Sequence, residues 1–153
     1  KLFAIEPYPQ IILRKGFLGF FKLIVKKVEN VNLDIFEKLE DGDILFIDSS
    51  HVARFGSDVN HIFFEILPRL KKGVYVHIHD VFFPYDYPKS WVITEHRFWS
   101  EQYLLHAFLL FNNSFEVILA NNYLIHKFLP EVKRTFPNSP SFGGGSFWMR
   151  KVK

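Results

Sequence analysis

The sequence predicts an α/β fold built on an open, mostly parallel sheet with helices on both faces. Along the 153-residue chain, short apolar runs alternate with stretches of helical periodicity. The apolar runs are continuous, as in strands buried on both faces of a parallel sheet. Several of them end on acidic or imidazole side chains. Because alternating strands and helices are typical of such sheets, we expect a single domain over residues 1–153.

The composition is that of a folded protein, with 48% hydrophobic and 18% aromatic residues and a formal net charge of +3. Basic residues are scattered among acids, so no nucleic acid is expected as a partner. The absence of cysteine excludes disulfides and thiolate metal sites and favours a cytoplasmic setting. The apolar stretch Gly16–Val25 contains Lys22 and is too short to span a bilayer, so no membrane association is expected.

The first two strands are predicted near the start of the chain. Leu2–Ile5 is a short apolar run closed by Glu6, and it predicts the first strand. Tyr8–Phe21 is mixed in character and has room for a short helix. Leu23–Val28 is rich in β-branched and aliphatic residues, and it predicts the second strand.

A short helix and a third strand are expected next. The spacing of apolar side chains over Leu33–Leu39 suits a helix, with Asn32 as its N-cap. Asp41–Asp43 is predicted to form a turn. Ile44–Ile47 is a continuous apolar run that ends at Asp48. The run predicts a strand buried on both faces.

The longest helical pattern follows Ser57, which is a suitable N-cap. Its apolar residues recur at the spacing of one helix face. They are Val59, Ile62, Phe63, Ile66 and Leu67. Val74–Ile78 then predicts a strand that ends at His79–Asp80.

The remaining elements are an aromatic insertion, two helical segments and two strands. The insertion covers Val81–Trp99, and its aromatics suit a ligand pocket, core packing or an oligomer contact, so a homo-oligomer stays open. In order, we expect a helix over Glu101–Phe111, a strand over Phe115–Leu119, a helix and loop over Asn121–Phe136 broken at Pro130, and a strand over Ser146–Val152 entered through Gly143–Gly145. Those glycines allow a close backbone approach into a closing hairpin.

Polar side chains at the strand ends are the candidate binding residues, since ligands of open α/β sheets bind outside the carboxyl ends of the strands. They are Glu6, Glu29, Asn30, Asp48 to His51, and His77 to Asp80. Glu6 is suited to accept hydrogen bonds from both hydroxyls of a ribose, which makes it a candidate nucleotide-binding residue.

Asp48, His79 and Asp80 close two strands that would be neighbours, so we predict them as ligands of a divalent cation. Oxygen ligands suit magnesium or calcium, and an imidazole adds manganese, iron or zinc. His51 follows Asp48 by three residues and is a candidate general base, with a surface histidine as the alternative. His77 shares a strand face with His79 but lies deeper, so we expect it in the core or behind the site.

Several runs of the sequence resemble the small-molecule O-methyltransferases of the class I, Rossmann-like fold. The family pattern is a strand ending in Asp with a nearby His, a helix, "LP-x-L-K-x-G", and a strand ending in "HD". The matching runs are Ala4–Pro9, Asp43–His51, Ile66–Gly73, His77–Val81, Trp99–Leu105 and Gly144–Arg150. Together they span nearly the whole chain.

The resemblance implies methyl transfer from S-adenosylmethionine to a hydroxyl of a small molecule, with Mg²⁺ or another divalent cation as a possible aid. Glu6 would hold the cofactor ribose, and Glu29 and Asn30 would lie by the adenine. Asp48, His79 and Asp80 would face methyl donor and acceptor, so His79 and Asp80 join His51 as candidate catalytic residues. His79 stands where the family would have an acid, which leaves the metal's identity open.

The family's first strand and glycine-rich turn would precede Lys1. The resemblance therefore implies that residues 1–153 are the C-terminal part of a methyltransferase-like catalytic domain, truncated at its N-terminal side, and it leaves open whether this part is active alone. The missing strand would be central, so its two neighbours are expected to lack a partner.

Three other functions fit parts of the pattern. A nicotinamide-dependent oxidoreductase predicts the acid at Glu6 but not the His79–Asp80 pair. A catalytically inactive Rossmann-like interaction domain fits the missing turn but not the clustered acids and imidazoles. A hydrolytic metalloenzyme built on His77, His79 and Asp80 usually needs a larger barrel. Sugars, polyketides and phenols all remain open as acceptors.

Overall fold

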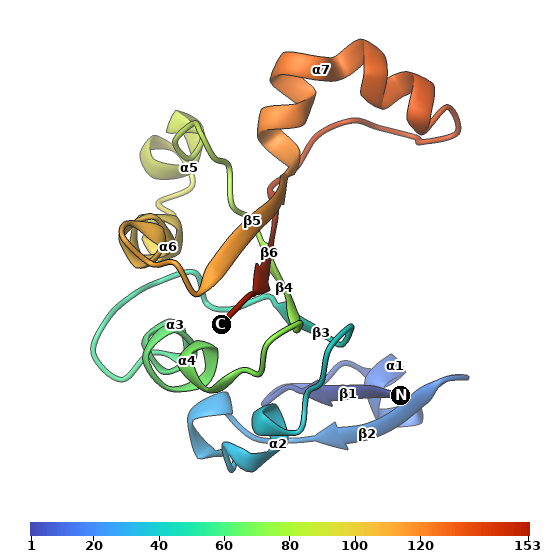
Figure 1. Cartoon of the computed structure of the whole chain (residues 1–153), viewed down its shortest axis with the longest axis vertical. Coiled ribbons are helices and arrows are strands. Elements are labelled where there is room, and N and C mark those ends of the chain that lie inside the picture. Colours follow the sequence, from blue (N-terminus) through green and yellow to red (C-terminus); the bar gives the residue numbers. More distant parts are fainter.

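The computed structural model describes all residues 1–153 and arranges six strands in two sheets (Figure 1). The smaller sheet pairs β1 (Leu2–Ile5) with β2 (Phe20–Ile24) in parallel. The larger sheet has the order β3-β4-β6-β5. Its strands are β3 (Ile44–Ile47), β4 (Tyr75–His79), β5 (Phe115–Ala120) and β6 (Ser146–Lys151). β3 and β4 are parallel and β6 is antiparallel to both its neighbours, so the α/β class with an antiparallel last strand is confirmed.

Short helices connect the strands. They are α1 (Ile11–Lys15), η1 (Val28–Asn30), α2 (Asp34–Glu37), α3 (Asp58–His61), η2 (Ile62–Ile66), α4 (Leu67–Arg69), α5 (Lys89–Ile93), α6 (Glu101–Leu109) and α7 (Asn121–Thr135). The π-helical η2 joins α3 to α4 in one continuous helical stretch. Ser57 caps it as predicted, because its hydroxyl accepts a hydrogen bond from the Asn60 backbone N–H at 3.3 Å. None of these helices is long and apolar enough to cross a lipid bilayer.

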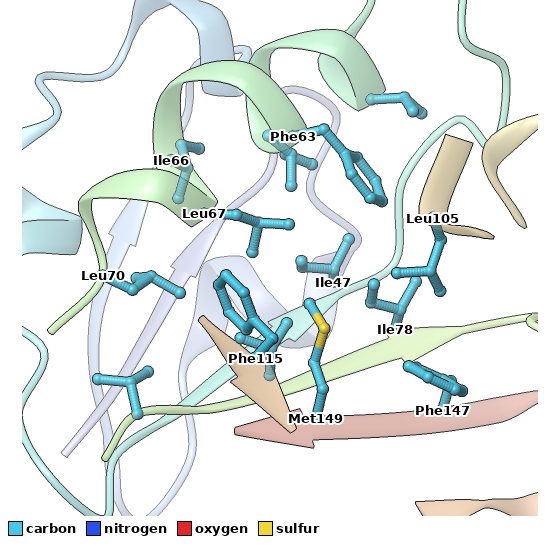
Figure 2. Close-up of a cluster of buried hydrophobic side chains, with 14 of the residues drawn as sticks. Ile47, Phe63, Ile66, Leu67, Leu70, Ile78, Leu105, Phe115, Phe147 and Met149 are labelled. Carbon is cyan, nitrogen blue, oxygen red and sulfur yellow. The ribbon is translucent and has the colours of Figure 1, made fainter. Parts of the chain in front are cut away.

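The main core lies between the larger sheet and the helices α3, η2, α4 and α6 (Figure 2). The apolar stripe predicted from residue 59 to residue 67 is entirely buried. Phe63 and Leu67 come down onto the sheet from the helical stretch, and Leu105 comes from α6. Ile78 and Met149 meet them from β4 and β6. This packing confirms the amphipathic helix. It also holds β3 and β4 in place, and with them the residues that follow these two strands.

The other face of the larger sheet is open. Ile44 and Phe46 are 56% and 59% exposed, whereas Ile47 on the opposite face is buried. The prediction that Ile44–Ile47 is buried on both faces is therefore wrong for one face. The helices that pack on this sheet all lie on the side of Ile47, to the left of the strands in Figure 1.

The two sheets are interrupted between β1 and β3. β1 pairs only with β2 and β3 pairs only with β4, so each has one edge without a strand partner. Leu2 and Phe3 on β1 are 48% and 46% exposed, and β3 carries the exposed Ile44 and Phe46. β1 and β3 thus each have one free edge, as do β2 and β5 at the other ends of the two sheets.

Several elements differ from the predictions, four of them in ways that change the description of the fold. The second strand runs over Phe20–Ile24 instead of Leu23–Val28, and the chain has already turned into η1 at Val28. The insertion after β4 contains the short α5. The helix from Glu101 ends at Leu109, since Phe111 adopts a positive φ of 60° and is fully exposed. The predicted break at Pro130 is instead a distortion at Phe128 inside α7.

Candidate functional site

The ends of β3 and β4 bring four polar side chains together. Asp48 directly follows β3, His79 ends β4, Asp80 comes next, and His51 returns from the loop after β3. His51 Nε2 lies 3.4 Å from Asp48 Oδ1 and 3.8 Å from Asp80 Oδ2. His79 Nδ1 lies 3.7 Å from Asp48 Oδ1 and 3.3 Å from Asp80 Oδ1. The parallel pairing of β3 with β4 explains this convergence, because neighbouring parallel strands end at the same edge.

Glu101 holds the ring of His51 through Nδ1, the ring nitrogen that does not face the cluster. Its carboxylate is 1% exposed, and Oε2 lies 2.8 Å from His51 Nδ1. The other oxygen accepts a hydrogen bond from the Ser49 hydroxyl at 2.8 Å. The Trp99 ring lies 4.2 Å from the imidazole, centroid to centroid. His51 is therefore buried, hydrogen-bonded through Nδ1 and directed through Nε2 toward Asp48 and Asp80.

Glu101 is not among the site residues predicted from the sequence. The run Trp99–Leu105 contributed only to the family resemblance. A carboxylate and an amide, Glu101 and Gln102, are both buried at the start of a mostly apolar helix. Acidic residues are seldom fully buried without a partner, but burial cannot be read from one sequence. No local pattern therefore marks Glu101.

Asp80 and His51 both adopt left-handed backbone conformations, with φ of 56° and 58°. Such conformations are uncommon for residues with a side chain, and they cluster at binding and catalytic sites. The Asp80 backbone N–H donates to the Gly145 carbonyl at 2.9 Å. A Cβ atom on Gly145 would lie 2.7 Å from Val81 N, so only glycine permits this approach. The predicted close contact of the glycine run is confirmed, and it lies directly behind Asp80.

The carboxylates determine the charge of His51. Burial opposes its protonation, but the hydrogen bond and charge of Glu101, together with the charges of Asp80 and Asp48, outweigh burial. The pKa of His51 is consequently raised above its ordinary value. The site is an anionic cluster that favours a bound positive charge.

His77 lies behind the cluster, as expected. It is buried, and its ring lies between those of Phe46 and Trp148, with centroids 4.7 and 4.6 Å away. Its Nε2 lies 2.7 Å from the Ser146 hydroxyl. Burial and then the neighbouring His79 lower its pKa. His77 therefore supports the sheet as a neutral side chain.

The donor atoms of Asp48, His51 and His79 all lie within 4.8 Å of one another, so these three side chains can surround one cation. Asp80 lies outside this group. The His79 Nδ1 atom is buried and has no hydrogen-bond partner. Two imidazoles and one carboxylate form a donor set suited to first-row transition metals.

The predicted nucleotide-binding residues lie on the N-terminal part of the chain. Glu6 follows β1 in the smaller sheet, and its Oε1 accepts a hydrogen bond from the Tyr8 N–H at 2.7 Å. Glu29 and Asn30 belong to η1, which packs against α3. No hydrogen bond or ion pair joins these three residues to the cluster at Asp48.

Two surface cavities lie away from these residues. One of about 390 Å³ is lined by Asp86, Gln102, Tyr103 and neighbouring side chains beside α6. The other, of about 330 Å³, lies on the open sheet face against Ile44 and Trp148. Neither includes Glu6, Asp48 or Asp80, so the chemistry of the strand ends and not cavity size defines the candidate site.

Comparison with known sequences identifies one family. A family model described as a methyltransferase domain matches residues 1–81, which is more than half of the chain. The matched span runs from β1 to just past β4 and contains Asp48, His51, His79 and Asp80. No curated protein and no solved structure matches the chain.

Proposed function

Because the chain belongs to the methyltransferase-domain family, of the class I S-adenosylmethionine-dependent type, we propose that it transfers a methyl group from S-adenosylmethionine to a hydroxyl of a small molecule. One observation carries the proposal. The strand ends of the matched region bring two carboxylates and two imidazoles together at one edge of the sheet. A site of this kind can bind an acceptor oxygen and remove its proton.

The methyl donor would lie along the ends of β1, β2 and β3. Glu6 has one carboxylate oxygen without a hydrogen bond and is suited to a ribose hydroxyl. Glu29 and Asn30 follow β2 and would border the adenine. Asp48 would face the methionine end. The packing of η1 against α3 supports this path, since it joins the N-terminal part to the helix that follows the cluster.

The complete binding site would include one more strand. β1 and β3 each have an unpaired edge, and exposed apolar side chains border both. We propose that a strand fits between them and that its following turn holds the methionine end of the donor. Residues 1–153 would then be the C-terminal part of the catalytic domain.

The reaction would be an in-line displacement. The acceptor oxygen attacks the sulfonium methyl carbon, the carbon–sulfur bond breaks with its electron pair left on sulfur, and the hydroxyl proton leaves. Because the donor is already activated, the protein mainly aligns the two centres and excludes water. Removing the proton makes the oxygen a better nucleophile.

The four side chains of the cluster suit these tasks. A bound divalent cation would lower the pKa of a hydroxyl that touches it. In the division of roles that the family resemblance implies, Asp48, His79 and Asp80 would hold such a cation. His51 would accept the acceptor's proton through Nε2, which is directed at the cluster because Glu101 occupies Nδ1.

Binding of S-adenosylhomocysteine, compared by calorimetry with binding of NAD, tests the proposed function. The protein should bind S-adenosylhomocysteine and not NAD, and Glu6→Ala should weaken binding at least tenfold. The exposed Glu40 provides the matched control, so Glu40→Ala should bind as the wild type does. Binding of NAD alone would replace the proposal with an oxidoreductase. Binding of neither ligand by a protein that includes the proposed additional strand and turn would favour an interaction domain.

A further inference from the structure

We infer that Asp48, His51 and His79 form a binding site for a first-row transition-metal cation, and that Glu101 positions His51 for it. The inference deepens the proposed function, because it concerns the same cluster. It replaces the roles proposed above: His51 is a metal ligand and not the general base, and Asp80 lies outside the ligand set.

The separations in the cluster match those between ligands of one cation. Asp48 Oδ1 lies 3.4 Å from His51 Nε2 and 3.7 Å from His79 Nδ1. Ligands bound at about 2.0–2.2 Å in a tetrahedral site are roughly 3.3–3.6 Å apart. Charge-assisted hydrogen bonds are shorter, at about 2.7–2.9 Å. The three donor atoms therefore converge without bonding to one another.

His51 is oriented as a metal-binding histidine. A metal-bound imidazole almost always donates its other N–H to a carboxylate or carbonyl, which fixes its tautomer. Here Glu101 Oε2 lies 2.8 Å from Nδ1, so the Nδ1 proton points to Glu101 and the Nε2 lone pair faces the cluster. The His51 side chain is 8% exposed, and Trp99 packs on its ring. The orientation of the His51 ring is thus fixed without a bound metal.

His79 provides an independent observation. Its Nδ1 atom is buried within the cluster and has no hydrogen-bond partner. Buried polar atoms without partners are rare in folded proteins, and a bound ion can satisfy such an atom. The Asp48 side chain is 57% exposed, so the third ligand leaves the cation open to solvent and to an acceptor oxygen.

Asp80 contacts both histidines but with different oxygens. Oδ1 lies 3.3 Å from His79 Nδ1 and Oδ2 lies 3.8 Å from His51 Nε2. It falls outside the group whose donor atoms can surround one cation. Asp80 therefore adds negative charge beside the site without being required to hold the metal.

The donor set selects the class of metal. Magnesium prefers oxygen ligands in octahedral geometry, whereas imidazole suits zinc, iron, cobalt and related divalent ions. Two imidazoles with one carboxylate also form the three-ligand set of catalytic zinc sites that keep an open position. Zn²⁺ and Co²⁺ should therefore bind here much more tightly than Mg²⁺.

Metal titration of the chelator-treated, tag-free protein tests the inference, with Zn²⁺ and Mg²⁺ followed by calorimetry and Co²⁺ by its visible absorption. We expect one Zn²⁺ or Co²⁺ per chain, bound at least 100-fold more tightly than Mg²⁺. His51→Ala and His79→Ala should each lose at least 100-fold in affinity. Glu101→Gln should lose about 10- to 100-fold in metal affinity, as expected for a residue that is hydrogen-bonded to a metal ligand. Asp80→Asn and the exposed control His106→Ala should stay within threefold of wild type.

Three results would each overturn the inference. They are equal affinities for Mg²⁺ and Zn²⁺, the absence of stoichiometric metal binding, and loss of binding in Asp80→Asn with retention in His79→Ala. Circular dichroism checks that each variant folds. The His79 side chain is 44% exposed, so His79→Ala should fold and keeps the test decisive if His51→Ala does not. The titration uses neither methyl donor nor acceptor. Metal binding without S-adenosylhomocysteine binding would therefore refute the proposed function alone, and the reverse result would refute this site alone.

Discussion

Replacing Gly145 with alanine should destabilise the protein through the backbone behind Asp80. A Cβ at this position would lie 2.7 Å from Val81 N and 2.8 Å from Asp80 Cα. Both atoms belong to the backbone, so neither can rotate away as a side chain would. Overpacking of this kind costs about 1–3 kcal/mol. With an m-value of roughly 1–3 kcal/mol/M, a loss of about 2 kcal/mol lowers the urea midpoint by about 1 M.

Gly143 is the matched control, because an added Cβ there meets nothing within 4 Å and its φ is not positive. Gly143→Ala should leave the urea midpoint unchanged or raise it slightly, since alanine restricts the unfolded chain. Equal midpoints for the two alanine variants would show that the close approach at Gly145 is wrong. A destabilised Gly145→Ala should also bind metal less tightly, because the proposed ligand His79 directly precedes the displaced residue Asp80.

The remaining predictions concern the cluster and the helix that follows it. Glu101→Ala should destabilise the protein by about 3–5 kcal/mol in chemical denaturation, because it leaves His51 and the Ser49 hydroxyl buried without their partner; a loss under about 1 kcal/mol would contradict the buried pair. Ser57→Ala should lower stability by about 1 kcal/mol through loss of the cap at α3, and an unchanged midpoint would mean that this cap is dispensable. Asp80→Asn should reduce formation of S-adenosylhomocysteine, assayed with a panel of sugars and phenols, by at least about 100-fold, whereas unchanged turnover would remove Asp80 from the reaction.

Much of the fold follows from local sequence patterns. Continuous apolar runs predicted β1 and β3 to the residue, and helical spacing predicted the buried stripe that covers the sheet. The meeting of Asp48, His79 and Asp80 was also predictable. Consecutive parallel strands end at one edge, so residues that close them must lie near one another.

Other features depend on contacts that no local pattern encodes. Glu101 reaches His51 across 50 positions of sequence, so its role emerges only when α6 is packed against the loop after β3. The exposure of Phe46 was mispredicted because burial of a strand depends on what covers the sheet, and no helix covers this face. The inclusion of His51 with Asp48 and His79 likewise depends on a left-handed backbone turn at His51.

Photocrosslinking of methyl-labelled S-adenosylmethionine tests most directly whether the ends of β3 and β4 receive the reactive end of the donor. Trypsin separates this chain into fragments that include residues 39–54, with Asp48 and His51, and residues 73–89, with His79 and Asp80. The label should appear in these two fragments and decrease when unlabelled S-adenosylhomocysteine competes. Competed label confined to other fragments, such as residues 98–127, would contradict a methyl-transfer centre at this edge of the sheet.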